Sequence, residues 1–195
     1  MLYITYVILG DTMAIKKITS EEIIESALNF IKEKGYENLN ARSLASHLKC
    51  STQPIIYFQF QNMNDLKLNV LKKAKEHYET YILTNLKKEN TLFMGCLKGM
   101  INYAKEYKNI FSFIFEKDYV KTPEEDKFNK QIVEGIMKAG GYSFEDALMF
   151  FNQSWIFSYG IACGIINGYM MFSDEEIDSL LKHQFEALKL YYKRN

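Results

Sequence analysis

The sequence predicts an all-α protein of about nine helices, and three observations support this fold class. No segment shows the sustained alternation of apolar and polar residues that is typical of β-strands. The 195 residues include only two prolines, Pro54 and Pro123, so long helices can run uninterrupted. Apolar residues recur instead at helical spacing, behind capping signatures such as Thr19-x-x-Glu22. We therefore expect helices throughout and no sheet.

Start and stop signals place the first four helices. Thr19 and Gly35 bound the first, and Asn40 is the expected N-cap of the second. A tight turn then leads to a short third helix, which tolerates Pro54 because N–H groups of a first turn have no intrahelical partner. Asn62 caps a long fourth helix. The expected ranges are 20–34, 41–48, 53–57 and 63–86.

The second half of the chain continues in the same pattern. Pro123 suits the first turn of a helix that ends at a glycine pair, Gly140 and Gly141. Ser143 and Ser173 each precede an acidic residue by three positions, as the N-caps of the last two helices would. The expected ranges here are 92–107, 111–115, 123–140, 144–171 and 174–192.

Composition and charge indicate a globular protein with one basic end. Hydrophobic residues make up 48% and charged residues 25%, as in ordinary globular domains. The net charge is zero, but residues 1–75 hold 10 Lys/Arg and 7 Asp/Glu (net +3), whereas residues 76–195 hold 14 and 17 (net −3). A basic N-terminal part suits nucleic-acid binding. The three cysteines are far apart without a C-x-x-C motif, so we expect free thiols in a reducing cytoplasm.

The chain divides into an extension and two functional parts. Residues 1–12 are apolar but lack the charged region and the cleavage site of a signal peptide, so we expect a cytoplasmic protein. We hypothesise that translation naturally starts at Met13, which the intact mass of the native protein would test. We expect a helix-turn-helix DNA-binding domain over 13–66 and a helical ligand-binding and dimerisation domain over 67–195.

The segment 40–71 carries the most specific motif. It predicts two short helices joined by a tight turn, then aromatic residues, then the start of a long helix. With GYENLNARSLASHLKCSTQP at 35–54, Phe60 and NMNDL at 62–66, the chain resembles the TetR family of bacterial transcription regulators over nearly all its length after Met13. The resemblance implies a homodimer that binds a palindromic DNA operator, acts as a repressor and is released by a small-molecule effector.

Two departures from the family pattern are visible. WIFSYG at 155–160 is similar to a Trp-x-x-x-His-Gly motif of some members, with Tyr159 in place of the histidine. The interval between Pro54 and Phe60 is one residue longer than in relatives that share Cys-Ser-Thr-Gln-Pro. Either one residue is inserted near Ile55 or the register of the recognition helix shifts.

The expected DNA contacts follow from the chemistry of each side chain. Gln53 can bond adenine N6 and N7 together, and Thr52 can contact a base or a thymine methyl group. The third helix has no arginine, so we expect an operator rich in A·T pairs. Ser51 is alternatively only a helix cap, and Lys67 only a solvated lysine. The predicted DNA-binding residues are Asn40, Arg42, Ser51, Thr52, Gln53, Pro54, Tyr57 and Lys67.

The uncharged segment 147–173 is long enough to be considered as a membrane span, but its polar residues argue against one. We expect a buried helix whose small residues recur every four positions and let another helix approach. The family resemblance implies that the last two helices of each subunit pair across a two-fold axis. The predicted dimer-interface residues are Gly160, Gly164, Gly168, Ile177, Leu181, Phe185 and Leu188.

The C-terminal part is rich in aromatic residues, and the resemblance implies a ligand pocket between its helices. Such a lining suits an apolar or aromatic effector, whereas simple core packing is the alternative for any single residue. No metal or cofactor is expected. The predicted ligand-binding residues are Tyr103, Phe111, Phe115, Phe151, Asn152, Trp155 and Tyr159.

Two other classes of function were weighed. An enzyme is not expected, because His47, His77 and His183 are isolated and neither a glycine-rich phosphate loop nor a nucleophile elbow is present. The remaining alternative is a helical ligand-binding or partner-binding protein without specific DNA binding.

Overall fold

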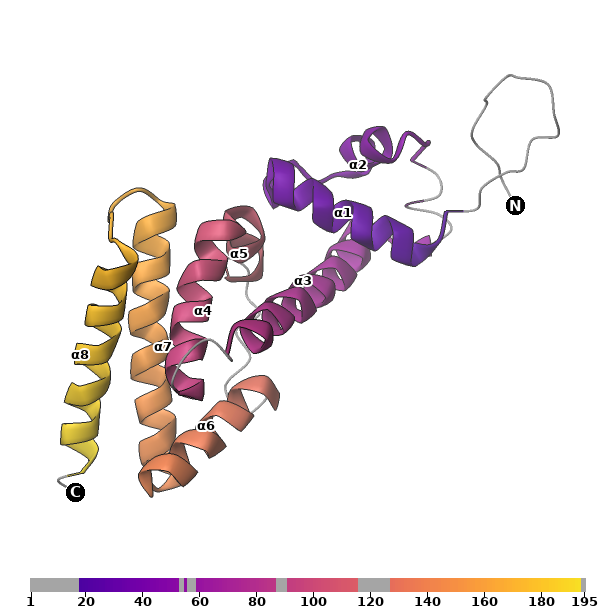
Figure 1. Cartoon of the computed structure of the whole chain (residues 1–195). Helices are drawn as coiled ribbons and strands as arrows, with labels where there is room; N and C mark the ends of the chain where they lie inside the picture. The colour runs from indigo at the N-terminus through magenta and orange to yellow at the C-terminus, as the bar shows by residue number, and fades with distance from the viewer. Residues whose placement is uncertain (1–17, 53–54, 56–58, 87–90, 116–126, 194–195) are drawn as a thin grey trace.

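The all-α prediction is confirmed. A computed structural model describes residues 18–52, 55, 59–86, 91–115 and 127–193, and in these ranges the chain forms eight α-helices and one 3₁₀ helix, with no strand (Figure 1). Parts of the predicted helices at 53–57 and 123–140 lie outside the described residues. The elements are α1 (Ser20–Lys34), η1 (Tyr36–Asn38), α2 (Ala41–Leu48), α3 (Met63–Asn85), α4 (Leu92–Glu106), α5 (Lys108–Phe115), α6 (Lys127–Gly140), α7 (Phe144–Ile166) and α8 (Asp174–Tyr192).

The predicted N-caps are present, which explains why these helices begin where they do. Thr19 and Ser173 each form a reciprocal capping box with the glutamate three residues later. The Asn40 side chain accepts hydrogen bonds from the N–H groups of Arg42 and Ser43, at 3.1 and 3.0 Å. Asn62 caps α3 in the same way. Each cap satisfies N–H groups that lack a partner within the helix.

The end of α7 differs from the prediction. The helix stops at Ile166 and does not reach 171, because Gly168 adopts a left-handed φ of +75°. The N–H of Tyr169 donates to the carbonyl of Gly164 at 2.9 Å, and that of Gly168 to the carbonyl of Ile165 at 3.0 Å. This pair of bonds is the Schellman arrangement that ends a helix at a glycine. Gly168 therefore lies outside α7 and cannot share a helix face with Gly160.

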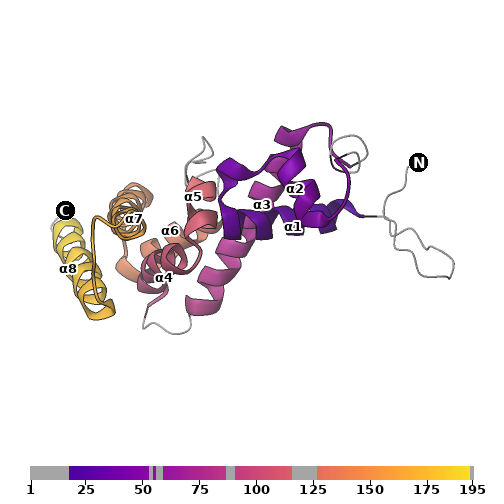
Figure 2. The same cartoon turned by 90° about the horizontal axis from the view of Figure 1, so that it is seen from above.

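The helices form two packed groups that α3 joins. Helix α1 packs on the N-terminal part of α3, α2 packs on α1, and α4, α6, α7 and α8 form a bundle towards the other end of α3 (Figures 1 and 2). The first group has a core around Ile23, Leu44 and Leu66, all 0% exposed. In the bundle, α7 and α8 form an antiparallel hairpin at the edge far from α2.

Aromatic and charged side chains hold the junction between the two groups. His77 Nδ1 on α3 lies 2.8 Å from the hydroxyl oxygen of Tyr103 on α4, which is fully buried. The Lys32 ammonium of α1 lies over the ring of Tyr107, 4.7 Å from its centroid. Asn109 of α5 also donates a hydrogen bond to the Lys32 carbonyl at 3.0 Å. Movement of α3 against α4 would therefore disturb α1 and α5 as well.

The His77 contact predicts a pH dependence of stability. Burial lowers the pKa of His77, and the charge of Lys32 lowers it further, whereas Glu106 and Glu25 oppose the shift. A group whose pKa falls on folding contributes stability that is present above its unfolded pKa, about 6.5. That stability is lost as the pH falls through the lower pKa of the folded state.

We therefore expect the urea midpoint to fall between about pH 7.5 and about pH 5.5, and to fall more in the wild-type protein than in a His77→Gln variant. The matched control is His183→Gln, which changes an exposed histidine on α8 and should keep the wild-type fall. An equal fall in the wild-type and His77→Gln proteins would contradict the assignment of this pH dependence to His77.

Candidate functional site

The predicted helix-turn-helix includes a sharp turn after α2. Lys49 adopts the left-handed conformation (φ 53°, ψ 42°), and the N–H of Cys50 donates to the carbonyl of Ala45 at 3.0 Å. This turn redirects the chain as a helix-turn-helix requires. Ser51 and Thr52 follow it and are half-buried. The predicted contacts Gln53, Pro54 and Tyr57 lie outside the described residues.

The structure gives different surroundings to the other predicted DNA contacts. Arg42 is exposed in the first turn of α2, where a cation can reach a phosphate. Asn40 is also exposed, but its side-chain oxygen already caps α2. Lys67 is half-buried on α3. Arg42 is therefore the described side chain best placed for a phosphate contact.

Within the interval between Pro54 and Phe60, the structure describes only Ile55 and Gln59. Ile55 and Phe60 are buried in the core, at 0% and 7% exposure. Gln59 Nε2 donates to the carbonyl of Ile18 at 3.2 Å. Whether one residue is inserted or the register of the recognition helix shifts depends on residues outside the described ranges.

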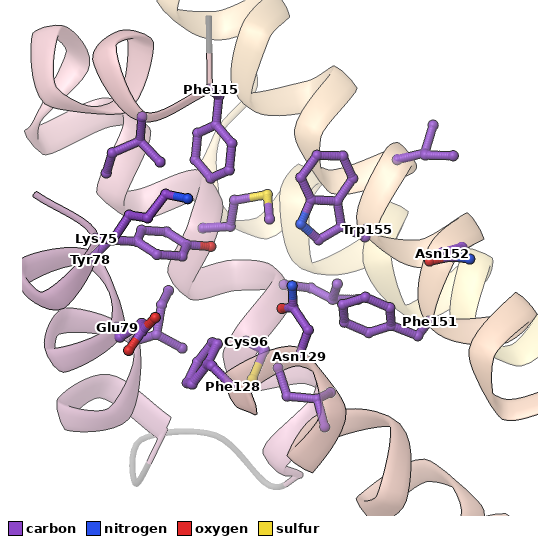
Figure 3. Close-up of a pocket in the computed structure, with 16 residues that line it drawn as sticks. Lys75, Tyr78, Glu79, Cys96, Phe115, Phe128, Asn129, Phe151, Asn152 and Trp155 are labelled. Carbon is purple, nitrogen blue, oxygen red and sulfur yellow. The ribbon is translucent and has the colours of Figure 1, made fainter. Parts of the chain in front are cut away.

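A cavity of about 320 Å³ lies between α3, α4, α5, α6 and α7 (Figure 3). Aromatic and aliphatic side chains form most of its wall, and a few polar groups reach it from α3, α6 and α7. This composition is that of a small-molecule site. The lining residues are Lys75, Tyr78, Glu79, Ile82, Cys96, Leu97, Met100, Ile114, Phe115, Phe128, Asn129, Ile132, Phe151, Asn152, Trp155 and Ile156.

The cavity lining includes four of the seven residues that were predicted to bind a ligand. Phe115, Phe151, Asn152 and Trp155 line the cavity, but three predicted residues do not. Tyr103 is fully buried and bonded to His77, and Phe111 is 1% exposed in the core. Tyr159 stacks on Trp155, with ring centroids 5.1 Å apart and an interplanar angle of 9°. These three side chains contact neighbouring aromatic residues, so they belong to the core or support the cavity wall from behind.

Sequence reasoning missed the walls that α3 and α6 contribute. Tyr78, Glu79 and Ile82 lie three, four and seven positions after Lys75, so the four residues share one side of α3. Asn129 adds a polar group from α6. The spacing of these residues indicates a shared helix face. The sequence does not show that this face lines a cavity, because its mixture of charged and apolar residues resembles a helix face exposed to solvent.

The predicted dimer stripe on α8 requires a correction. Ile177, Leu181 and Leu188 are at most 8% exposed within a single chain. Phe185 is half-buried, and its ring lies 5.5 Å from that of Phe93 on α4 and 5.7 Å from that of Phe150 on α7, centroid to centroid. These side chains therefore pack α8 onto α4 and α7 of the same chain and are not the apolar residues that α8 exposes.

Gly160 and Gly164, both predicted to lie in the dimer interface, have different surroundings. A Cβ atom added to Gly164 would collide with the side chain of Met170, so this glycine makes room for its own chain. A Cβ added to Gly160 would meet nothing within 4 Å. Gly160 therefore lies on an open helix face, together with Met149 and Ile156, which are 50% and 63% exposed.

The described residues include neither a cluster of metal ligands nor a membrane-spanning helix. No group of three or more His, Cys, Asp or Glu side chains is close enough there to hold a metal ion. None of the helices described is both long enough and apolar enough to cross a membrane. The three cysteines, Cys50, Cys96 and Cys163, are free.

Comparison with known proteins shows the fold and no more. No protein-family model and no curated protein matches this chain. Among solved structures, the fold is similar to that of a Rhodococcus sp. RHA1 protein of unknown function, with a TM-score of 0.68 and 12% sequence identity. The match covers 89% of this chain and 94% of the Rhodococcus protein, so the two share nearly their whole architecture.

Proposed function

We propose that this protein is a ligand-responsive, DNA-binding transcription regulator that acts as a homodimer and releases its operator when an effector fills the cavity. One observation carries the proposal: the same helix, α3, packs against the helix-turn-helix at one end and forms a wall of the cavity at the other. The helix-turn-helix motif and the resemblance to the TetR family favour DNA as the partner.

The contacts of α3 suit it to transmit a displacement. Its 23 residues span roughly 34 Å. Midway along α3, Lys73 Nζ lies 2.8 Å from a carboxylate oxygen of Glu21 and 2.7 Å from one of Glu25, both on α1. The cavity wall starts at Lys75. A ligand that shifts this end of α3 would move α1 through these ion pairs, and α2 with it, because α2 packs on α1.

In a homodimer, that movement would change the spacing of two recognition surfaces. A palindromic operator requires a fixed spacing between them, so DNA affinity would fall. The ligand can shift the equilibrium only by its difference in affinity for the two forms. The apolar residues exposed on the outer faces of α7 and α8 support self-association, and Tyr191 of α8 is 62% exposed there.

The salt dependence of DNA binding tests this function. Arg42→Ala should weaken binding to duplex DNA and reduce the slope of log affinity against log salt by about one, because it removes one phosphate contact. The matched control is Lys138→Ala, which removes an exposed charge on α6 and should leave the slope unchanged. Fluorescence anisotropy of labelled DNA measures both. Wild-type protein without measurable DNA binding would instead favour the ligand-binding alternative.

A further inference from the structure

The helices α3 and α4 approach each other closely near the C-terminal end of α3, where α4 carries two glycines. A Cβ atom added to Gly95 would lie 2.9 Å from the side chain of Leu86, and one added to Gly99 would lie 2.8 Å from the side chain of Ile82. A residue without a Cβ atom allows this approach, whereas a larger one would push the helices apart. The glycine contact therefore fixes this end of α3 against α4 and can serve as a pivot for the rest of the helix.

A second contact between the two helices lies further toward the N-terminus of α3. His77 Nδ1 lies 2.8 Å from the hydroxyl oxygen of Tyr103, which is one turn beyond Gly99 on α4 and is fully buried. The ring centroids of Tyr103 and Tyr107 lie 5.6 and 4.9 Å from that of His77. These surroundings favour the neutral imidazole, because a buried charge loses its hydration. We call the His77–Tyr103 contact the lock between α3 and α4.

The cavity lies directly beside this lock. Tyr78, the residue after His77 on α3, lines the cavity, and its ring centroid lies 5.0 Å from that of Tyr103 (Figure 3). Met100, which is one turn before Tyr103 on α4, lines the cavity as well. Both helices that form the lock are therefore walls of the cavity. A ligand that spreads these walls acts on residues that are next to the lock.

Charged and titratable side chains face His77 from α1, α3 and α4. Lys32 of α1 opposes protonation of the ring, whereas Glu25 of α1 and Glu106 of α4 favour it, and burial is the largest cause of the lowered pKa of His77. Water that enters an open lock would relieve the burial and leave two carboxylates against one ammonium. The pKa of His77 would therefore rise in the open form. The titratable aromatic groups around the ring are Tyr103 and Tyr107 of α4, with Tyr81 of α3 bonded to Glu106.

We propose that a ligand in the cavity turns α3 on its glycine contact with α4, opens the His77–Tyr103 lock and takes up a proton at His77, so that ligand and acid pH favour the same released form. This inference rests on the proposed function and deepens it, because it adds the proton as a second signal at the same site. Linkage requires the reverse effect too, since protonation of His77 must tighten ligand binding by the factor by which the ligand favours protonation.

Nuclear magnetic resonance of the histidine rings in the full chain tests the lock without ligand or DNA. Gly99→Val forces α3 away from α4, so we expect the pKa of His77 to rise toward its ordinary value, about 6.5. The control is Gly160→Val, which adds the same side chain where a Cβ atom meets open space and should leave the His77 titration unchanged. A folded Gly99→Val protein with the wild-type His77 titration would overturn the proposal. If valine prevents folding, Gly99→Ala gives the same test with a smaller wedge against Ile82.

Titration with N-phenyl-1-naphthylamine, a neutral aromatic probe, tests the coupling to the cavity. Trp155 is the only tryptophan of the chain and lines the cavity, so quenching of its emission reports probe bound there. We expect wild-type protein to bind the probe about threefold or more tightly at about pH 5.5 than at about pH 7.5. His77→Gln should bind it equally at both, and His183→Gln should keep the wild-type difference.

Equal wild-type affinities at the two pH values would overturn the proposal, as would a pH dependence that survives in His77→Gln. Because DNA is absent from both experiments, failure here is distinguishable from failure of the DNA-binding function.

Discussion

Replacing Leu66 by alanine is expected to lower the free energy of unfolding by about 3 kcal/mol, since it removes a fully enclosed side chain and leaves a cavity. Leu66 lies in the first turn of α3 and is 0% exposed. A loss of this size is a large share of the stability of an ordinary domain. Urea denaturation followed by circular dichroism measures it.

The control for this substitution lies two residues further along the same helix. Leu68 is 47% exposed, so Leu68→Ala should change the unfolding free energy by no more than about 0.5 kcal/mol. The two variants lose the same atoms and differ only in their surroundings. Equal effects would mean that the Leu66 face of α3 is not packed against the N-terminal group of helices.

Replacing Gly160 by glutamate is expected to give a monomer with DNA affinity reduced by about 100-fold or more, because two linked half-site contacts bind far more tightly than one. The single chain has open space for the new side chain, so its fold should persist. In the proposed dimer, two like charges would meet on an apolar face. Analytical ultracentrifugation gives the oligomeric state, and anisotropy gives the DNA affinity.

The matching control places the same charge on a helix outside the proposed interface. Ala139 is exposed near the end of α6, and Ala139→Glu should preserve both the dimer and DNA binding. A Gly160→Glu protein that remains dimeric would contradict the assignment of the α7–α8 outer face. A wild-type protein that is monomeric would contradict the homodimer itself.

Local signals in the sequence were sufficient for most of the fold. The caps at Thr19, Asn40 and Ser173 are satisfied by bonds within the next three residues, so the sequence alone places these helix starts. The end of α7 was also readable, since Gly168 follows Asn167 as a glycine follows a helix end. A continued apolar pattern beyond it favoured the longer prediction.

The partner of each apolar face was not predictable from spacing. The stripe through Ile177, Leu181 and Leu188 indicates burial, but the same pattern serves a core and a dimer interface. Likewise, aromatic composition pointed to Trp155 and Phe151 in the cavity but could not separate them from Tyr103. That separation depends on how α3, α4, α6 and α7 meet in space.

Enrichment of the full-length protein on random-sequence DNA, at about 150 mM salt, tests the central claim most directly. The account predicts a palindromic motif with an A·T-rich core, and loss of its enrichment when Gln53 is replaced by alanine. A folded, ligand-free protein that enriches no motif would contradict the account and leave a helical ligand-binding protein in its place.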